Sequence, residues 1–309
     1  MESIKSQFSD GIQKLLSLIP AEAHVSESNV YQEGIPAVLP FIDSIIERYL
    51  EEGSGILGLE NLLALYRHAK EGESCLMLME HYSNFDLPVF HYLLRKSGPQ
   101  GAQLASDIVA IAGIKLNEEN PAVHAFARGY SRIVIYPSRS MEIIKTKYRD
   151  PKEMYREMKR SLAINRAAMK AMEQAKTSGK IILVFPAGTR YRPWDPQSKK
   201  GVREIASYIK AFSKFCLVSV NGNILRINPS GDMAEDILSH DKVLYNVSPV
   251  HDSREFLTAV KSELHFREDK KQAIVDILMD ILDSMHRETE ALHDSPESSA
   301  AKKSEDSAH

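Results

Sequence analysis

From about residue 74 onward, short apolar runs alternate with long helical patterns, and this alternation restricts the possible folds more than any other part of the sequence. The apolar runs have the length of buried strands, and the segments between them carry apolar residues at helical spacing. This alternation predicts an α/β protein with a mixed central sheet covered by helices. The expected strands span residues 75–79, 107–112, 131–136, 181–185, 216–220 and 242–247, and the expected long helices span residues 151–178, 200–214, 253–264 and 268–292.

The two ends of the chain differ from this middle part. Residues 1–70 show only helical patterns, which predicts a small N-terminal helical domain ahead of an α/β domain at 71–293. Residues 294–309 carry Ser, Lys and Glu without a strong apolar pattern, which predicts a disordered tail. The helical patterns of the first part cover residues 3–19, 36–52 and 57–70.

The composition argues against several classes of protein. The formal net charge is −3, which implies no general affinity for nucleic acid. Cys75 and Cys216 both lie in apolar runs, and we expect them to be reduced core residues of a cytoplasmic protein. No run approaches the roughly 20 apolar residues that cross a bilayer, and the first residues lack the pattern of a secretory signal.

The first candidate site is the segment from His81 to Asp86. It follows the expected strand at 75–79 and precedes Pro88, a residue that suits the first turn of a helix. His81 and Asp86 therefore bracket a strand-to-helix turn at the carboxyl end of a strand, where open α/β sheets bind ligands. Here His81 can act as a base that Asp86 orients. In the alternative interpretation, Asp86 caps the helix and His81 is an ordinary loop histidine.

The second candidate site is the segment from Phe185 to Arg192, directly after the strand expected at 181–185. Gly188 permits a tight turn that a side chain would obstruct. Arg190 and Arg192 are alternate residues and can point to the same side of an extended segment. Two guanidinium groups on one side suit a phosphate, because each can donate two parallel hydrogen bonds. The alternative is a solvated arginine pair in a surface loop.

Together the two segments resemble the glycerolipid acyltransferase family, whose signatures are a His-four residues-Asp block and a Pro-Glu-Gly-Thr-Arg-like block. Within that family they are similar to the soluble chloroplast-type glycerol-3-phosphate 1-acyltransferases, whose second block ends in Gly-Arg-x-Arg. Residues 126–129 and 132–136 also resemble a block of those enzymes that precedes a phosphate-contacting segment. The resemblance covers roughly residues 40–200, in one order and with similar spacing.

Four positions depart from the family pattern. Ala187 stands where the family has Glu, and Arg139-Ser140 stands where the chloroplast type has Lys-His, so that one cation remains. Glu80 precedes His81, where the family usually has a small or amide residue.

The resemblance implies an sn-glycerol-3-phosphate 1-O-acyltransferase of phospholipid biosynthesis. The donor would be acyl-CoA or an acyl-carrier protein, and the chemistry would need no metal or other cofactor. His81 would be the base and Asp86 its orienting partner. Two alternatives stay open: a 1-acylglycerol-3-phosphate O-acyltransferase, and a non-catalytic lipid- or phosphate-binding protein. The residues implied around the substrate phosphate are Arg139, Gly188, Thr189, Arg190 and Arg192.

An apolar stripe near the N-terminus bears on membrane contact. It can lie on a membrane surface, but packing against other helices is the commoner role of such a stripe and the one we expect. A lipid product would still require transient peripheral contact with a membrane surface. The stripe consists of Ile4, Phe8, Ile12, Leu15, Leu16 and Ile19.

Overall fold

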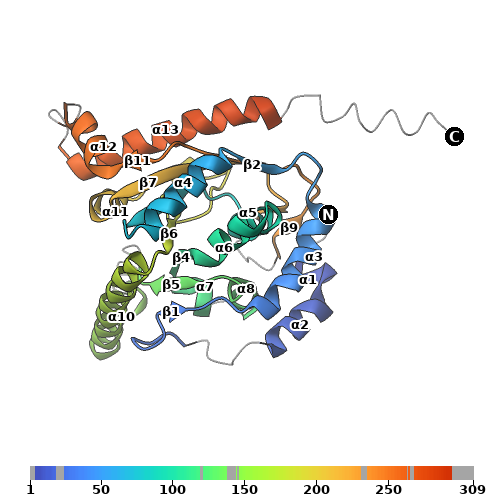
Figure 1. Ribbon diagram of the computed structural model, residues 1–309. Coiled ribbons are helices and arrows are strands. Elements are labelled where there is room, and N and C mark those ends of the chain that lie inside the picture. Colours follow the sequence, from blue (N-terminus) through green and yellow to red (C-terminus); the bar gives the residue numbers. More distant parts are fainter. Residues whose placement is uncertain are drawn as a thin grey trace, which may run out of the picture.

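The computed structural model describes residues 4–18, 24–118, 121–137, 144, 146–230, 235–262, 264 and 268–293. Strands and helices alternate along most of this part of the chain (Figure 1). The strands are β1 (Tyr31–Gln32), β2 (Gly55–Leu57), β3 (Cys75–Met79), β4 (Ile108–Gly113), β5 (Arg132–Ile135), β6 (Ile181–Val184), β7 (Lys214–Asn221), β8 (Leu225–Arg226), β9 (Ile237–Leu238), β10 (Leu244–Val247) and β11 (His251–Asp252). The α-helices are α1 (Ile4–Gln7), α2 (Ser9–Ser17), α3 (Leu39–Tyr49), α4 (Leu59–Lys70), α5 (Asp86–Lys96), α6 (Pro99–Asp107), α7 (Lys115–Glu118), α8 (Pro121–Ala127), α10 (Pro151–Thr177), α11 (Ile205–Ala211), α12 (Ser253–Ala259) and α13 (Lys270–His293). Short 3-10 helices lie at Pro36–Val38, Pro196–Lys199 and Val260–Ser262.

A large mixed sheet forms the centre of the fold, with the strand order β1-β5-β4-β6-β3-β7-β10-β2. From β5 to β7 all neighbouring strands are parallel. In contrast, β1 is antiparallel to β5, and β10 is antiparallel to β7. Parallel neighbours bring their carboxyl ends to the same edge of a sheet, where α/β proteins bind ligands. The segments that follow β3 and β6 therefore begin side by side.

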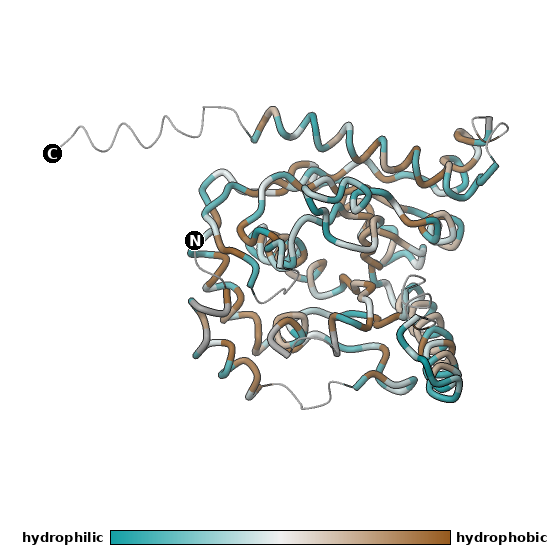
Figure 2. The backbone as a smooth tube through the Cα atoms, turned by 180° about the vertical axis from the view of Figure 1, so that it is seen from behind, coloured by the Kyte–Doolittle hydropathy of each residue, from teal (hydrophilic) through white to brown (hydrophobic). Residues whose placement is uncertain are grey.

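Helices cover both faces of the sheet, because both faces carry apolar side chains. Successive side chains of a strand point to opposite faces. All five residues of β3 are buried: Cys75, Met77 and Met79 belong to one apolar cluster, whereas Leu76 and Leu78 belong to the other. The first cluster includes residues of α3, α4 and α5, and the second includes residues of α10, α11 and α13. Hydrophobic and hydrophilic residues alternate along α13, as expected of a helix with one buried face (Figure 2).

The expected α/β architecture is confirmed, and most expected elements lie within a few residues of their predicted bounds. The strand predicted at 75–79 is β3, and the helix predicted at 151–178 is α10. The helix predicted at 200–214 is shorter, since α11 spans only Ile205–Ala211. The residues before α11 fold back instead, and the backbone N–H of Val202 donates a hydrogen bond to the carbonyl of Pro186 at 2.8 Å.

The N-terminal part contains the expected helices but also two short strands. β1 pairs with β5 and β2 pairs with β10, so residues before position 71 contribute strands at both sides of the central sheet. In the N-terminal stripe, Ile4, Ile12 and Leu15 are buried and Phe8 packs against Phe41, which confirms packing for these residues. A separate helical domain at 1–70 stays a prediction.

Some expectations fall outside the described residues. These are the expected tail at 294–309, the apolar residue Ile19 and the expected phosphate ligand Arg139. Among the helices that the structure describes, none is long and apolar enough to cross a membrane.

Candidate active site

The two candidate segments meet at the carboxyl edge of the sheet, as the order of β3 and β6 requires. The ring of His81, just after β3, stacks on the ring of Phe185, just after β6, with 3.9 Å between centroids and 16° between planes. The backbone N–H of Tyr191 donates a hydrogen bond to the carbonyl of His81 at 2.7 Å. The second segment therefore fixes both the backbone and the ring plane of the histidine.

Asp86 orients the His81 ring. Its Oδ2 lies 2.8 Å from Nδ1 of His81 and also accepts the backbone N–H groups of Tyr82 at 2.7 Å and Ser83 at 2.9 Å. The carboxylate is buried, whereas the His81 side chain remains 17% exposed. An acceptor at Nδ1 places the ring proton there and leaves the lone pair on Nε2. In the described part of the chain, Nε2 has no hydrogen-bond partner, so it can accept a proton from a bound molecule.

The turn after β6 depends on Gly188. Its φ of +64° is left-handed, a conformation that favours glycine, and its N–H donates to the carbonyl of Phe185 at 2.9 Å. Gly188 is exposed and Thr189 is half-buried. The turn leads the chain back past His81 and carries Arg190 to the site.

Arg190 and Arg192 lie in different environments. Arg190 is buried and forms an ion pair with the carboxylate of Asp236, which is itself fully buried. The side chain of Arg192 is 39% exposed, and its contact with Asp195 is long, at 3.9 Å. Asp236 also lies 3.4 Å from the side-chain amide nitrogen of Asn84, a residue of the first segment. The carboxylate of Asp236 thus links the two segments. The sequence did not predict this link, because Asp236 is 46 residues from Arg190.

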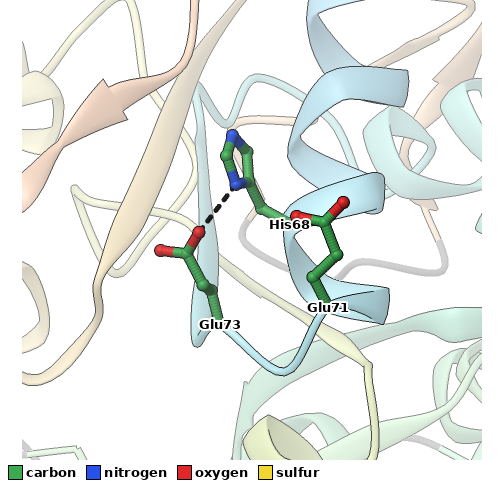
Figure 3. A group of neighbouring side chains, drawn as sticks. All are labelled: His68, Glu71 and Glu73. Atoms are coloured by element: carbon green, nitrogen blue, oxygen red, sulfur yellow. Dashed lines mark hydrogen bonds and ion pairs between the residues drawn. The ribbon is translucent and has the colours of Figure 1, made fainter.

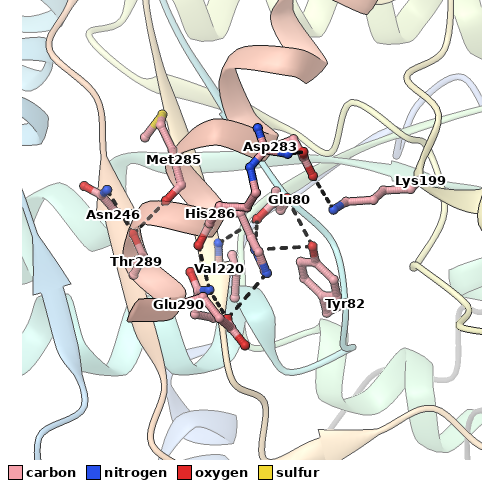
Figure 4. A network of polar contacts seen from close by, with 12 residues as sticks. Glu80, Tyr82, Lys199, Val220, Asn246, Asp283, Met285, His286, Thr289 and Glu290 are labelled. Carbon is pink, nitrogen blue, oxygen red and sulfur yellow. Dashed lines mark hydrogen bonds and ion pairs between the residues drawn. The ribbon is translucent and has the colours of Figure 1, made fainter. Parts of the chain in front are cut away.

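Glu80 precedes His81 in sequence but its carboxylate bonds elsewhere (Figure 4). Oε2 accepts the backbone N–H of Val220 at 3.0 Å and lies 2.8 Å from Nδ1 of His286 in α13. Oε1 accepts the hydroxyl of Tyr82 at 3.1 Å. Burial, and next the charge of Glu80, raise the pKa of Tyr82 well above its usual range, so the hydroxyl stays a donor. This carboxylate therefore anchors the residue before His81 to β7 and α13, and it also holds the side chain of Tyr82, the residue after His81.

Further contacts tie α13 to the ends of neighbouring strands (Figure 4). The side-chain amide of Asn221, the last residue of β7, donates to the carbonyl of His286 at 3.0 Å. Lys199, which follows the second segment, lies 2.8 Å from Asp283, and this hydrogen bond lowers the pKa of Asp283. The sequence predicted only a long helix at residues 268–292, because no local motif marks these long-range partners.

Neither cysteine has the environment of a reactive nucleophile. Cys75 and Cys216 are free and fully buried. Burial raises the pKa of Cys75 to about 12, which keeps it as a neutral thiol near neutral pH. Both residues therefore fit the core role that the sequence predicted.

Another cluster of titratable side chains, His68, Glu71 and Glu73, lies at the opposite edge of the sheet (Figure 3). Nδ1 of His68 lies 2.8 Å from a carboxylate oxygen of Glu73, and the ammonium of Lys214 lies 3.8 Å from the other oxygen. Glu73 precedes β3 whereas His81 follows it, so the length of the strand separates this cluster from His81. The cluster is not part of the candidate active site.

The arrangement is chemically suited to general-base catalysis: a histidine whose Nε2 has no partner among the described residues, a carboxylate hydrogen-bonded to its other ring nitrogen, and an arginine-bearing turn beside them. The sequence model of the Acyltransferase family matches residues 58–220, more than half of the chain, and the chain belongs to this family. Both candidate segments fall inside the matched residues, whereas Asp236 and α13 fall outside them. A comparison with curated proteins found no similar sequence. Membership of the family supports acyltransferase activity in lipid metabolism.

Proposed function

We propose that this protein is an sn-glycerol-3-phosphate 1-O-acyltransferase that takes its acyl group from acyl-CoA or an acyl-carrier protein. The observation that carries the proposal is the His81–Asp86 pair, with 2.8 Å between Nδ1 and Oδ2 and with Nε2 left for a substrate. A non-catalytic binding protein would have no need for a base held in one tautomer by a buried carboxylate. The arginine-bearing turn beside this base supports an acceptor with a phosphate.

The base acts on the acceptor hydroxyl. Nε2 of His81 takes the hydroxyl proton while the oxygen attacks the carbonyl carbon of the thioester. Asp86 stabilises the imidazolium that forms. The carbon–sulfur bond then breaks, and the proton on Nε2 passes to the leaving thiolate. The products are an ester and a free thiol. No acyl-enzyme is required, because the acyl group passes directly from the thioester to the acceptor oxygen, and the two buried cysteines are not placed to act as nucleophiles.

The two arginines take different roles toward the phosphate. Arg192, with an exposed side chain and one long ion pair, is the residue free to turn toward an anion. Arg190 has one N–H group on Asp236 and further donors in its planar fork, so it can bind the phosphate from a fixed position. Gly188 and Thr189 would bring the turn close to the same phosphate. Arg139, whose place the structure does not describe, is proposed as a further cation there.

An acceptor panel tests the proposal. The purified full chain would be given acyl-CoA or acyl-carrier protein and, in separate reactions, glycerol 3-phosphate, its 1-acyl derivative or glycerol. We expect glycerol 3-phosphate to be acylated fastest and glycerol to be a poor acceptor, because glycerol lacks the phosphate. A 1-acyl derivative that reacts much faster than glycerol 3-phosphate would replace this proposal with the 1-acylglycerol-3-phosphate O-acyltransferase.

The variant Arg192→Lys separates phosphate binding from acyl-donor binding. It keeps the charge but loses the planar donor set, and a charge-assisted hydrogen bond is worth roughly 1.5–3 kcal/mol. We expect about a tenfold or larger fall in kcat/KM with glycerol 3-phosphate and little change in KM for the acyl donor. Unchanged kcat/KM in this variant would remove Arg192 from the phosphate site.

A further inference from the structure

Helix α10 presents an exposed apolar stripe that no part of the described chain covers. Tyr155, Leu162 and Met169 are 61%, 60% and 65% exposed. They are seven residues apart, which is nearly two helical turns, so their side chains line up along one side of the helix. Large apolar side chains are seldom aligned in this way on a surface that meets only water.

A row of positive charges borders the stripe. α10 contains seven basic and three acidic residues, although the whole chain has a net charge of −3. Five of the basic side chains are exposed and form no ion pair with any residue that the structure describes. One of them, the ammonium of Lys159, lies 5.2 Å from the ring centre of Tyr155. The five are Lys152, Arg156, Lys159, Arg166 and Lys170.

The first half of α10 extends past the edge of the sheet that carries His81. The side-chain amide of Asn165 donates a hydrogen bond to the carbonyl of Tyr136, directly after β5, at 3.0 Å. The helix residues before Asn165 therefore continue beyond the carboxyl end of that strand, by up to about 20 Å at 1.5 Å per residue. No residue from 151 to 160 is buried. Tyr155 and its neighbouring cations thus lie beyond the same edge of the sheet as the candidate active site.

We propose that the exposed face of α10 docks on an anionic lipid surface, with the apolar stripe at the headgroup boundary and the five cations among the headgroups. The proposed function supplies only the reason for such docking, because an enzyme that makes an acylated lipid must deliver it to a membrane. A long helix with an apolar stripe and basic residues alongside is suited to a membrane interface. Long basic side chains can also extend along the stripe while their charges stay among the headgroups.

The charge of the face disfavours a second copy of the chain as its occupant. Two such faces would bring five unpaired cations against five others, and like charges brought together disfavour association. An acidic protein would satisfy the charges, but a straight, narrow stripe on a convex helix matches a fluid surface better than a shaped protein pocket. The lipid surface is therefore the occupant that the observations favour.

Vesicle sedimentation with the purified full chain tests the proposal without any substrate, so its outcome is independent of the acceptor assay. The vesicles would contain phosphatidylcholine alone or phosphatidylcholine mixed with phosphatidylglycerol. We expect binding to the anionic vesicles only, weakened by high salt. Leu162→Glu should reduce the partition coefficient by about tenfold or more, as should the triple variant Arg156→Ser, Lys159→Ser, Arg166→Ser.

Matched controls distinguish this face from the rest of the surface. Leu292→Glu alters another exposed leucine, 55% exposed and on α13, and should leave vesicle binding unchanged. The triple variant Lys210→Ser, Lys261→Ser, Lys270→Ser removes three exposed lysines elsewhere and should reduce binding far less than the α10 triple variant. Circular dichroism would verify that each variant is folded.

Three results would overturn the proposal. The first is a wild-type chain that does not bind anionic vesicles at low salt. The second is equal loss of binding in the α10 variants and their matched controls. The third is unchanged vesicle binding in folded α10 variants. If Leu162→Glu then separates a dimer or abolishes binding to an acidic acyl-carrier protein, the occupant of the face is a protein and not a lipid surface.

Discussion

Replacing Asp236 by Asn should destabilise the protein strongly, because it removes the counter-charge of a buried arginine. The side chains of Arg190 and Asp236 are only 10% and 1% exposed. Removing one partner of a buried ion pair typically costs about 3–5 kcal/mol, since the other charge stays buried without compensation. Against a total stability of about 5–15 kcal/mol, this is a large fraction. The amide keeps the size of the side chain, so a cavity does not explain the loss.

Urea denaturation measures this effect, and Asp195→Asn provides the matched control. Asp195 contacts Arg192 at 3.9 Å, and both of these side chains are more than a third exposed. An exposed pair of this kind contributes at most about 1 kcal/mol. The free energy of unfolding should therefore fall much further for Asp236→Asn than for Asp195→Asn.

A double variant separates the stability of the ion pair from its role at the site. Arg190→Met combined with Asp236→Leu removes both charges, and apolar replacements of a buried ion pair are often neutral or stabilising. This variant should recover most of the lost stability but not the kcat/KM for glycerol 3-phosphate. Two results would contradict these roles of the ion pair: an Asp236→Asn protein that loses no more stability than Asp195→Asn, or a double variant that acylates glycerol 3-phosphate normally.

Two further predictions concern α13 and a buried histidine. His286→Ala removes one partner of the Glu80 carboxylate, and urea denaturation should show a loss of about 1–3 kcal/mol in the free energy of unfolding. The variant should also have a lower kcat and an unchanged KM for the acceptor. An unchanged kcat would show that α13 does not position the active site. Burial lowers the pKa of His91 from 6.5 to about 4, so between those pH values the unfolded chain binds a proton that the folded protein does not. This histidine alone should make stability fall by up to about 1.4 kcal/mol for each pH unit as pH decreases through that range, and His91→Gln should flatten the decline. Parallel stability curves for wild type and His91→Gln would contradict this prediction.

The middle of the fold was predictable because its signals are local. β3 is a continuous apolar run, and α10 is a long helical pattern preceded by Asp150, whose side chain accepts the backbone N–H of Lys152. The pairing of His81 with Asp86 also follows from local sequence, since both belong to one strand-to-helix turn. These elements needed no knowledge of distant contacts.

What the sequence did not reveal depends on long-range partners. β1 and β2 are two and three residues long and form only because β5 and β10 offer them sheet edges. The burial of Arg190 depends on Asp236, 46 residues away, and the partners of Glu80 include a residue of α13. The two arginines looked equivalent in sequence, and only the tertiary structure distinguishes them.

The acyl-transfer rate of His81→Ala is the most direct test of whether His81 is the general base. Glycerol 3-phosphate and an acyl thioester would be the substrates, and His68→Ala, which alters a histidine at the opposite edge of the sheet, would be the control. Loss of a general base typically lowers a rate by about 10²–10⁴-fold. We predict such a loss for a folded His81→Ala protein and near wild-type activity for His68→Ala. Near wild-type turnover in folded His81→Ala would contradict the assignment of His81 as the base.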